Sequence, residues 1–258
     1  MKRLSMINLD KCTTAQLETM LEAGRDVFEC QGALARTGDN IVGELLPKEE
    51  TFYEFAHCPP GDVFDNETHS QFYYHAHRQG EHGHFHIFIR EQGMPEHCRP
   101  AKQSEAGYMK EREDKLSHLV AISMDKRGEP IGLFTTNRWV TAENWYAAKD
   151  VCAMADRFSI EHAKPSWPVN RWITAMIRLF RPQIEEILQE RDAVVAKWQA
   201  NHPDEDVFED RNLDLPSAVE ISIGEQIHAL ETAVPERRGR MQAKEQRSNP
   251  MTQVGESP

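Results

Sequence analysis

The stretch SQFYYHAHRQGEHGHFHIFIR, residues 70–90, decides the fold because apolar residues and histidines alternate along it. Side chains two residues apart on a strand share a face, so histidines gather on one face and Phe, Tyr and Ile on the other. The alternation predicts two strands, 70–78 and 83–90. A turn centred on Gly80 and Glu81 would join them into an antiparallel hairpin, since glycine is preferred at the first central position of a type II′ turn.

This hairpin would bring four histidines together as candidate metal ligands. The turn pairs His77 with His84 and His75 with His86, while His82 lies at the edge of the turn and is left out of the ligand set. Directly opposite residues have Cβ atoms about 4.5–5.5 Å apart, so three imidazoles can converge at a metal-bonding distance of about 2.0–2.1 Å. A slip of one residue would split the set across two faces. The pattern predicts a transition-metal site, and the alternative is a solvated hairpin face that carries several histidines.

Glu81 follows the first two histidines at a spacing that resembles a known motif. The segment from His75 to Glu81 has the form HxHxxxE. It resembles the first metal motif of cupins, in which two His and a Glu bind iron, manganese, nickel, zinc or copper, and this implies Glu81 as a further ligand. No second cupin motif follows downstream, and the third histidine would be the adjacent His84 or His86. The likeness therefore concerns the ligand chemistry and not a complete cupin barrel.

Four segments spread along the chain carry a wider resemblance. They are HCPPGDVFD (57–65), YYHAHRQGEHGHFHIF (73–88), NRWVTAENW (137–145) and SWPVNRW (166–172). Together they are similar to a family of uncharacterised bacterial proteins known as a domain of unknown function. The resemblance covers most of the chain up to its C-terminal end, and it implies no activity.

The residues around the histidines suggest a cofactor and catalytic groups. Imidazole-rich donor sets suit iron, zinc, copper, manganese and nickel, and we expect a divalent transition metal, with iron preferred. Tyr73 shares the histidine face and could donate a proton to a bound ligand. Glu81 could serve as a base, and Arg90 could bind a substrate carboxylate or pair across the hairpin with Gln71.

The leading hypothesis for the function is a metal-dependent enzyme, specifically a mononuclear non-haem iron oxidoreductase or oxygenase that acts on a small molecule. One alternative is a non-catalytic protein that stores or senses a metal or uses it structurally, with every coordination position closed by histidine. Another is a zinc-dependent hydrolase in which Glu81 acts on water. Haem ligation by one of the histidines is the weakest interpretation.

The rest of the sequence predicts an α+β fold, in which an antiparallel sheet of about four to five strands packs with several helices. Apolar residues at helical spacing after Thr13 and Thr14 predict a capped helix that ends near Gly38. Runs rich in Val, Ile and aromatic residues predict three further strands, 52–56, 118–124 and 131–136. Pro182 should kink or divide the longest of the later helices. Those helices are predicted over 142–158, 170–200 and 217–233.

Composition sets the expected organisation and partners. We predict a single metal-binding domain over residues 1–235 and a flexible tail over 236–258, which lacks apolar periodicity. The 42 acidic and 30 basic residues give a net charge of −12, which disfavours nucleic acid because such binding rests on Lys and Arg. No stretch reaches the roughly 20 apolar residues of a membrane span, and the five scattered cysteines indicate no disulfide framework. We therefore expect a cytoplasmic protein with a small-molecule substrate, and the sequence is compatible with a homo-oligomer.

Overall fold

The computed structural model describes residues 9–46, 56–78, 80–101 and 115–248, and it confirms an α+β fold. Its strands are β1 (Cys58–Phe64), β2 (Ser70–His75), β3 (Gly83–Arg90), β4 (Leu116–Met124), β5 (Pro130–Thr135) and β6 (Ser217–Glu220). Its α-helices are α1 (Thr14–Ala35), α2 (Arg138–Thr141), α3 (Ala148–Ala155), α4 (Trp167–Leu179), α5 (Arg181–Asn201) and α6 (Ile223–Ser248). Two 3₁₀ turns are η1 (Leu9–Lys11) and η2 (Glu91–Gly93).

The six described strands form one antiparallel sheet in the order β1-β2-β3-β4-β5-β6. This is slightly more than the predicted four to five strands. Sequence reasoning misses β1 because Pro59 and Pro60 argue against a strand, yet proline is compatible with an edge strand, which β1 is. Of the predicted strand 52–56, only Ala56 lies within the described residues, and it is not in a strand. Cupins are double-sheet jelly rolls, so the likeness to them does not extend to this single sheet.

Local sequence signals explain where the helices begin and end. At the start of α1, the Thr13 hydroxyl accepts a hydrogen bond from the Gln16 backbone N–H, while the Gln16 side chain accepts one from the Thr13 N–H. This capping box satisfies two of the free donors at the helix start. The predicted helix 170–200 is divided as expected, because α4 ends at Leu179 and Pro182 lies in the first turn of α5, where no donor is needed.

Two predicted helices differ from the observed ones. The helix predicted over 142–158 is shorter in the structure, where it forms α3. The helix predicted over 217–233 begins instead with the edge strand β6, and α6 then continues through Ser248. Helical structure thus extends into the stretch 236–258 that the sequence predicts as a tail. The division into a domain over 1–235 and a flexible tail stays a prediction.

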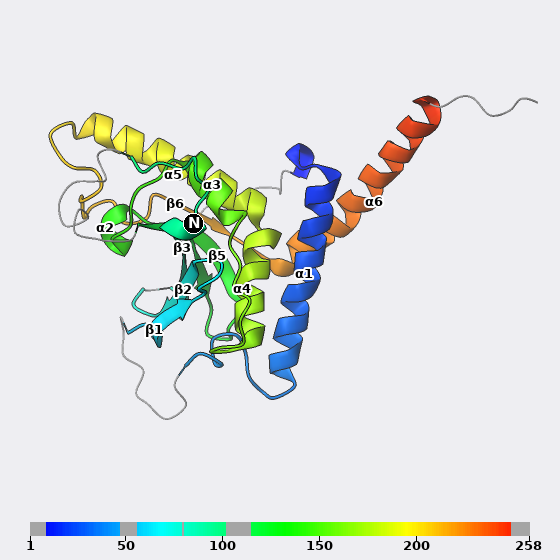
Figure 1. Cartoon of the computed structure of the whole chain (residues 1–258), viewed down its shortest axis with the longest axis horizontal. Helices are drawn as coiled ribbons and strands as arrows, with labels where there is room; N and C mark the ends of the chain where they lie inside the picture. Colours follow the sequence, from blue (N-terminus) through cyan, green and yellow to red (C-terminus); the bar gives the residue numbers. More distant parts are fainter. Residues whose placement is uncertain (1–8, 47–55, 79, 102–114, 249–258) are drawn as a thin grey trace, which may run out of the picture.

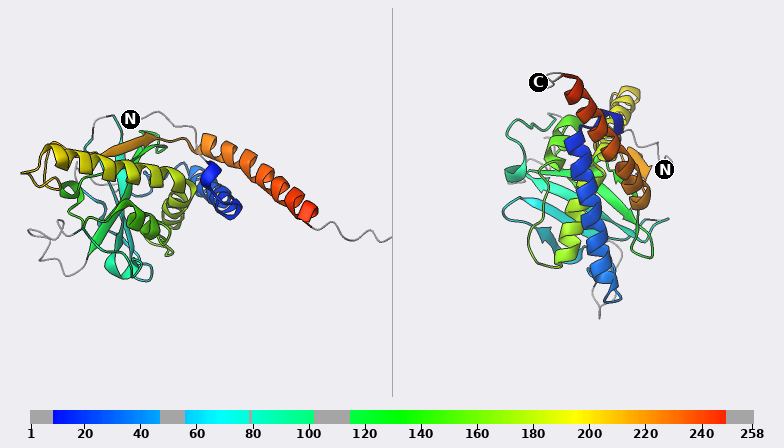
Figure 2. Two further views of the ribbon diagram at one scale, coloured as in Figure 1. Left: turned by 90° about the horizontal axis from the view of Figure 1, so that it is seen from above. Right: turned by 90° about the vertical axis from the view of Figure 1, so that its right-hand side faces the viewer.

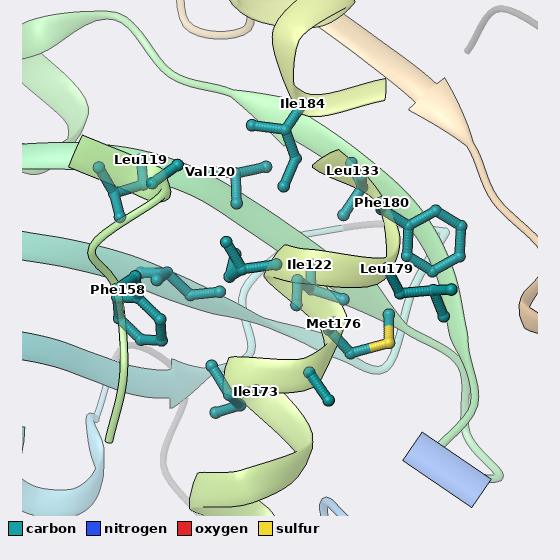
Figure 3. Packing of buried hydrophobic residues seen from close by; sticks show 14 of the residues in the cluster. Leu119, Val120, Ile122, Leu133, Phe158, Ile173, Met176, Leu179, Phe180 and Ile184 are labelled. Carbon is teal, nitrogen blue, oxygen red and sulfur yellow. The ribbon is translucent and has the colours of Figure 1, made fainter. Parts of the chain in front are cut away.

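The core lies between the apolar face of the sheet and the helices that cover it. Figure 3 shows this contact, in which side chains from β4 and β5 meet side chains from α4 and α5. The sheet contributes Val120, Ile122 and Leu133, and the helices contribute Ile173, Met176 and Ile184. The burial of these side chains fixes which face of the sheet the helices cover, and so leaves the histidine face on the other side.

The remaining helices extend the molecule away from the sheet. Helix α1 packs against α4 on one side and against α6 on another (Figure 1). Figure 2 shows that the C-terminal part of α6 projects beyond the rest of the protein. Among the helices that the structure describes, none combines the length and the hydropathy needed to cross a bilayer.

Candidate metal centre

The histidines lie on the second face of the sheet, in a register that differs from the predicted one. His75 on β2 lies opposite His84 on β3, and Tyr73 lies opposite His86. The predicted pairs, His77 with His84 and His75 with His86, are therefore wrong by two positions. Because strand side chains alternate with a period of two, this shift still leaves His75, His84 and His86 on a common face.

A connection longer than the predicted two-residue turn accounts for the new register. β2 ends at His75 and β3 begins at Gly83, so Glu81 and His77 both belong to the connection. Position 83 requires glycine, because a Cβ there would collide with the Tyr74 hydroxyl and with the His75 carbonyl oxygen. As a result, His77 lies beyond the end of β2 and is exposed.

Two imidazole nitrogens approach that of His84 beside β2 and β3. The Nε2 atom of His84 lies 2.8 Å from Nε2 of His75 and 3.1 Å from Nε2 of His86. Nitrogens bound to one ion at about 2.0–2.1 Å are separated by roughly 3 Å, so these contacts have the spacing of neighbours in a coordination shell. His75, His77 and His84 also each offer a nitrogen within 4.8 Å of the others. The buried cluster could therefore hold a metal ion, with His77 at its exposed rim.

Hydrogen bonding alone leaves this cluster unsatisfied. A neutral imidazole has one N–H and one lone pair. Nδ1 of His84 faces the carboxylate of Glu81, which can only accept, so Nδ1 carries the hydrogen and Nε2 presents its lone pair. That lone pair can accept one hydrogen bond, although both His75 and His86 approach it. A cation beside Nε2 of His84 would bind a lone pair that these contacts leave unpaired, so the donor set fits a metal.

Glu81 contacts the other ring nitrogen of His84, on the side away from Nε2. Its Oε1 is 2.5 Å from Nδ1 of His84, and its carboxylate also accepts a hydrogen bond from Ser123. Burial raises the pKa of Glu81, but the bonds with His84 and Ser123 outweigh it and hold the pKa below the ordinary 4.5. A carboxylate that accepts from the second N–H of a metal ligand orients the imidazole and increases its basicity. The geometry favours this role for Glu81 over that of a direct ligand or a base, which stay predictions.

His118 reaches the histidine face because β4 contains a β-bulge. Ile87 pairs with Val120 and Phe88 pairs with His118, which makes Leu119 an extra residue in β4. Simple alternation with Val120 would place His118 on the apolar face. The extra residue reverses that assignment and brings His118 to the cluster.

A chain of hydrogen bonds runs outward from His86 through His118. Nδ1 of His86 lies 3.0 Å from Nε2 of His118, and Nδ1 of His118 lies 3.2 Å from the Thr136 hydroxyl. If His86 uses Nε2 for the cluster, its Nδ1–H donates to His118, which in turn donates to Thr136. His84 therefore has a charged outer partner and His86 has a neutral one.

Burial keeps His75, His86 and His118 in the neutral form, which is the form that binds metals. It is the main cause that lowers the pKa of His75 to about 3, and neighbouring imidazoles add to it. The pKa of His118 is lowered to about 3 by burial and then by the positive charge of Arg191. Burial also lowers the pKa of His86. At neutral pH these nitrogens need not lose a proton before they bind a cation.

Tyr73 lies against the cluster, on the face where the sequence predicts it. Its ring centroid is 5.2 Å from that of His75 and 5.3 Å from that of His86. Its ring stacks on His57 at a centroid distance of 3.6 Å. Burial, followed by the charge of Asp62, raises the pKa of the Tyr73 hydroxyl, so it stays protonated at neutral pH. A catalytic role for Tyr73 stays a prediction.

Arg90 lies further along β3 and is engaged by a different set of partners. Its Nε donates to Oε1 of Gln71 at 2.8 Å, which is the predicted cross-hairpin pair. Gln71 donates to Asp62 at 2.6 Å, and Asp62 accepts from Nδ1 of His57 at 2.8 Å. Arg90 lies four positions after His86 on the strand, which corresponds to roughly 13 Å. The structure thus does not bring Arg90 to the cluster, and its role with a substrate stays a prediction.

Phe134 and Arg78 are neighbours of the cluster that sequence reasoning misses. Phe134 on β5 packs edge-on against His84, with ring centroids 5.2 Å apart. The guanidinium carbon of Arg78 lies 4.6 Å from the centre of the Phe134 ring, an arrangement typical of cation–π contacts. His57 is missed as well. Only the tertiary structure reveals these residues, and the alternation of His118 with apolar residues would have placed that histidine on the opposite face.

A buried carboxylate lies behind His118. Oε2 of Glu143 accepts a hydrogen bond from the backbone N–H of His118 at 2.7 Å, and Glu143 is 1% exposed. Burial raises the pKa of Glu143 to about 7, although Arg191 and this hydrogen bond act to lower it. An acid that titrates near neutral pH therefore lies directly outside the cluster.

Replacing Glu81 with glutamine should weaken metal binding by about 10–100-fold, the range typical of outer-shell partners. Glutamine keeps the size of the side chain and can still accept from His84, but it lacks the negative charge that increases the basicity of the imidazole. Isothermal titration of the metal-free protein would measure the loss. Glu91→Gln serves as the control, because Glu91 is exposed and pairs with Lys115. Equal affinities for the two variants would contradict the orienting role.

The comparisons with known proteins agree with the wider resemblance in the sequence. No curated protein and no solved structure matches the chain. Residues 21–221, which include every histidine of the cluster, match a family described as a domain of unknown function, DUF6969. The chain therefore belongs to the DUF6969 family.

Proposed function

We propose that this protein is a metal-dependent enzyme, specifically a mononuclear non-haem iron oxidoreductase or oxygenase that acts on a small molecule. The observation that carries the proposal is the approach of the Nε2 atoms of His75 and His86 to that of His84, at 2.8 and 3.1 Å. Three imidazole donors suit iron(II) and leave other coordination positions for ligands. Iron bound there would supply the capacity to activate O₂.

The side chains of the protein would bind the ion and control its surroundings. His75, His84 and His86 would hold it through Nε2, and Glu81 would fix the orientation of His84. The low exposure of the three histidines limits the access of water and strengthens electrostatic interactions at the site. The hydroxyl of Tyr73 would be a proton donor on the same face.

The state of Glu81 favours oxidative over hydrolytic chemistry. A zinc-dependent hydrolase would need this carboxylate as the base that acts on water. Glu81 already bonds with His84 and Ser123, and these bonds lower its pKa and hence its basicity. A carboxylate engaged in this way is suited to orienting a ligand and poorly suited to accepting a proton from water.

His77 supports a second candidate function, a non-catalytic metal-binding protein. Its ligand nitrogen lies within 4.8 Å of those of His75 and His84. A movement of its exposed side chain would supply a fourth imidazole and close the site. Such a closed site would suit storage, sensing or a structural role.

The two candidates can be separated by oxygen uptake. Protein purified without an affinity tag, stripped of metal and reloaded with iron(II) in the absence of air should consume O₂ on exposure to it in the presence of a substrate mixture. His86→Ala should reduce this uptake to the rate of free iron, whereas His228→Ala, on α6, should leave it unchanged.

The same preparation tests the role of His77. In an enzyme with an open site, His77→Ala should keep stoichiometric iron and oxygen uptake. In a closed four-histidine site, it should lower metal affinity as strongly as His75→Ala. Native protein that contains a full equivalent of zinc and takes up no oxygen with iron would contradict the proposed oxygenase.

A further inference from the structure

A second group of metal-binding side chains lies outside the histidine cluster. His97, Cys98 and Asp150 each offer one ligand atom, and these atoms all lie within 4.8 Å of one another. Cys98 and Asp150 are buried, at 7% and 8% exposure, while His97 is exposed. The group therefore has two inner donors and one donor at the surface, through which an ion could enter.

The local backbone holds Cys98 and Asp150 together. The N–H of Cys98 donates to the carbonyl of Pro95 in a tight turn, and Asp150 occupies the first turn of α3. The thiol of Cys98 lies 3.8 Å from the backbone carbonyl oxygen of Asp150. Two segments that are 52 residues apart in the chain thus meet at this point.

The carboxylate of Asp150 has an unused capacity to bind. The residue as a whole is 8% exposed, and none of the hydrogen bonds and ion pairs found among the described residues involves its carboxylate oxygens. A buried thiol directly beside it supplies the second donor.

We propose that His97, Cys98 and Asp150 form a zinc site that is separate in its ligands from the histidine cluster. Zinc is borderline soft and binds thiolate, imidazole and carboxylate together, commonly in tetrahedral sites. Three protein donors leave the fourth position to water. With ligand atoms within 4.8 Å of one another, small side-chain rotations, above all of exposed His97, bring them to zinc-bonding distances of about 2.0–2.3 Å.

The charges around Cys98 are compatible with this assignment. Burial, and then the carboxylate of Asp150, raise the pKa of the thiol, whereas Arg157, Arg99 and Lys149 lower it. Zinc binding would release the thiol proton, and the thiolate and carboxylate would balance the two positive charges of the ion. The ion would tie the segment before residue 98 to α3, so zinc should stabilise the folded protein.

The two sites can be separated with cobalt(II), which replaces zinc and reports on sulfur ligation. In the full-length His75→Ala/His84→Ala variant, reduced and kept from air, cobalt should bind in one equivalent and produce the near-ultraviolet sulfur-to-cobalt charge-transfer band. Adding Cys98→Ser should abolish the band. Cys152→Ser is the matched control, because Cys152 is also buried and lies on α3 beside Asp150, and it should leave the band unchanged.

His97→Ala tests the site without the risk of unfolding the protein, because an exposed side chain can be removed without disturbing the core. It should weaken cobalt binding by at least about tenfold, as expected for loss of one ligand. Retention of the band in Cys98→Ser, or absence of any bound cobalt when the cysteine is intact, would overturn the proposal. Either result leaves the histidine cluster untouched, because that cluster contributes no sulfur.

Discussion

Replacing His75 and His84 together with alanine is expected to remove one equivalent of bound transition metal per chain. The two Nε2 atoms lie 2.8 Å apart, and both side chains are buried on facing positions of β2 and β3. Removing them leaves His86 as the sole inner donor, and a single imidazole does not retain an ion against dialysis. Metal analysis of dialysed, untagged protein would measure the loss.

Two histidines elsewhere in the chain provide the control. His202 follows α5, where its ring stacks on Trp198 and its Nδ1 lies 3.0 Å from the Trp198 carbonyl oxygen. His228 lies on α6. The His202→Ala/His228→Ala variant removes the same number of imidazoles and should bind metal as the wild type does. Full metal content in the His75→Ala/His84→Ala variant would refute the centre that we describe.

Replacing Glu143 with glutamine should stabilise the protein, by an amount that grows as the pH rises from 4.5 and is complete above pH 7. Glu143 has a pKa of about 7 in the folded protein because it is buried, against an ordinary value of 4.5. Between these values the folded chain keeps a proton that the unfolded chain releases, so stability falls as the pH rises. The difference corresponds to roughly 3 kcal/mol, complete above pH 7 and absent below 4.5. Glutamine cannot ionise and avoids this loss.

Urea unfolding at pH 5 and pH 8 would measure the effect as a difference between the variant and the wild type. The buried His75 and His118 produce the opposite dependence, since their lowered pKa values favour the folded state at higher pH. Their contribution is common to both proteins and cancels at each pH. Glu220→Gln, at an exposed position of β6, should change stability little at either pH. Equal destabilisation of Glu143→Gln at both pH values would mean that the carboxylate is ionised throughout.

Sequence periodicity predicts which side chains share a face of the hairpin better than it predicts which residues of the two strands lie opposite each other. The bounds of β3 agree with the predicted strand 83–90 because histidines and apolar residues alternate from His84 to Ile87 and β-forming residues continue to Ile89. The register depends on the connection between the strands, in which the sequence offers both Gly80 and Gly83 as residues that suit a turn. In the structure, Gly83 begins β3 and lies close to the Tyr74 hydroxyl. This is a contact between two strands that the local sequence does not predict.

Composition also predicts the type of ligand better than its environment. His75, His84 and His86 stand out in the sequence because so many histidines occur close together. Phe134 and His57 come from other strands and loops, and only the observed strand order brings them to the site. The role of Glu81 could not be predicted from its spacing, because that spacing fits a ligand and an orienting partner equally well.

The bulge at Leu119 divides β4 into two segments. Even-numbered residues face the histidine cluster before the bulge and face the helices after it. Beyond the bulge, Val120 and Ile122 continue to supply the helices with apolar contacts. Before the bulge, the His118 side chain lies on the histidine face and contacts His86. One additional residue thus allows β4 to place apolar side chains against the helices and His118 against the histidine cluster, which strict alternation would not allow. The sequence pattern before the bulge can therefore change without a matching change in the pattern after it.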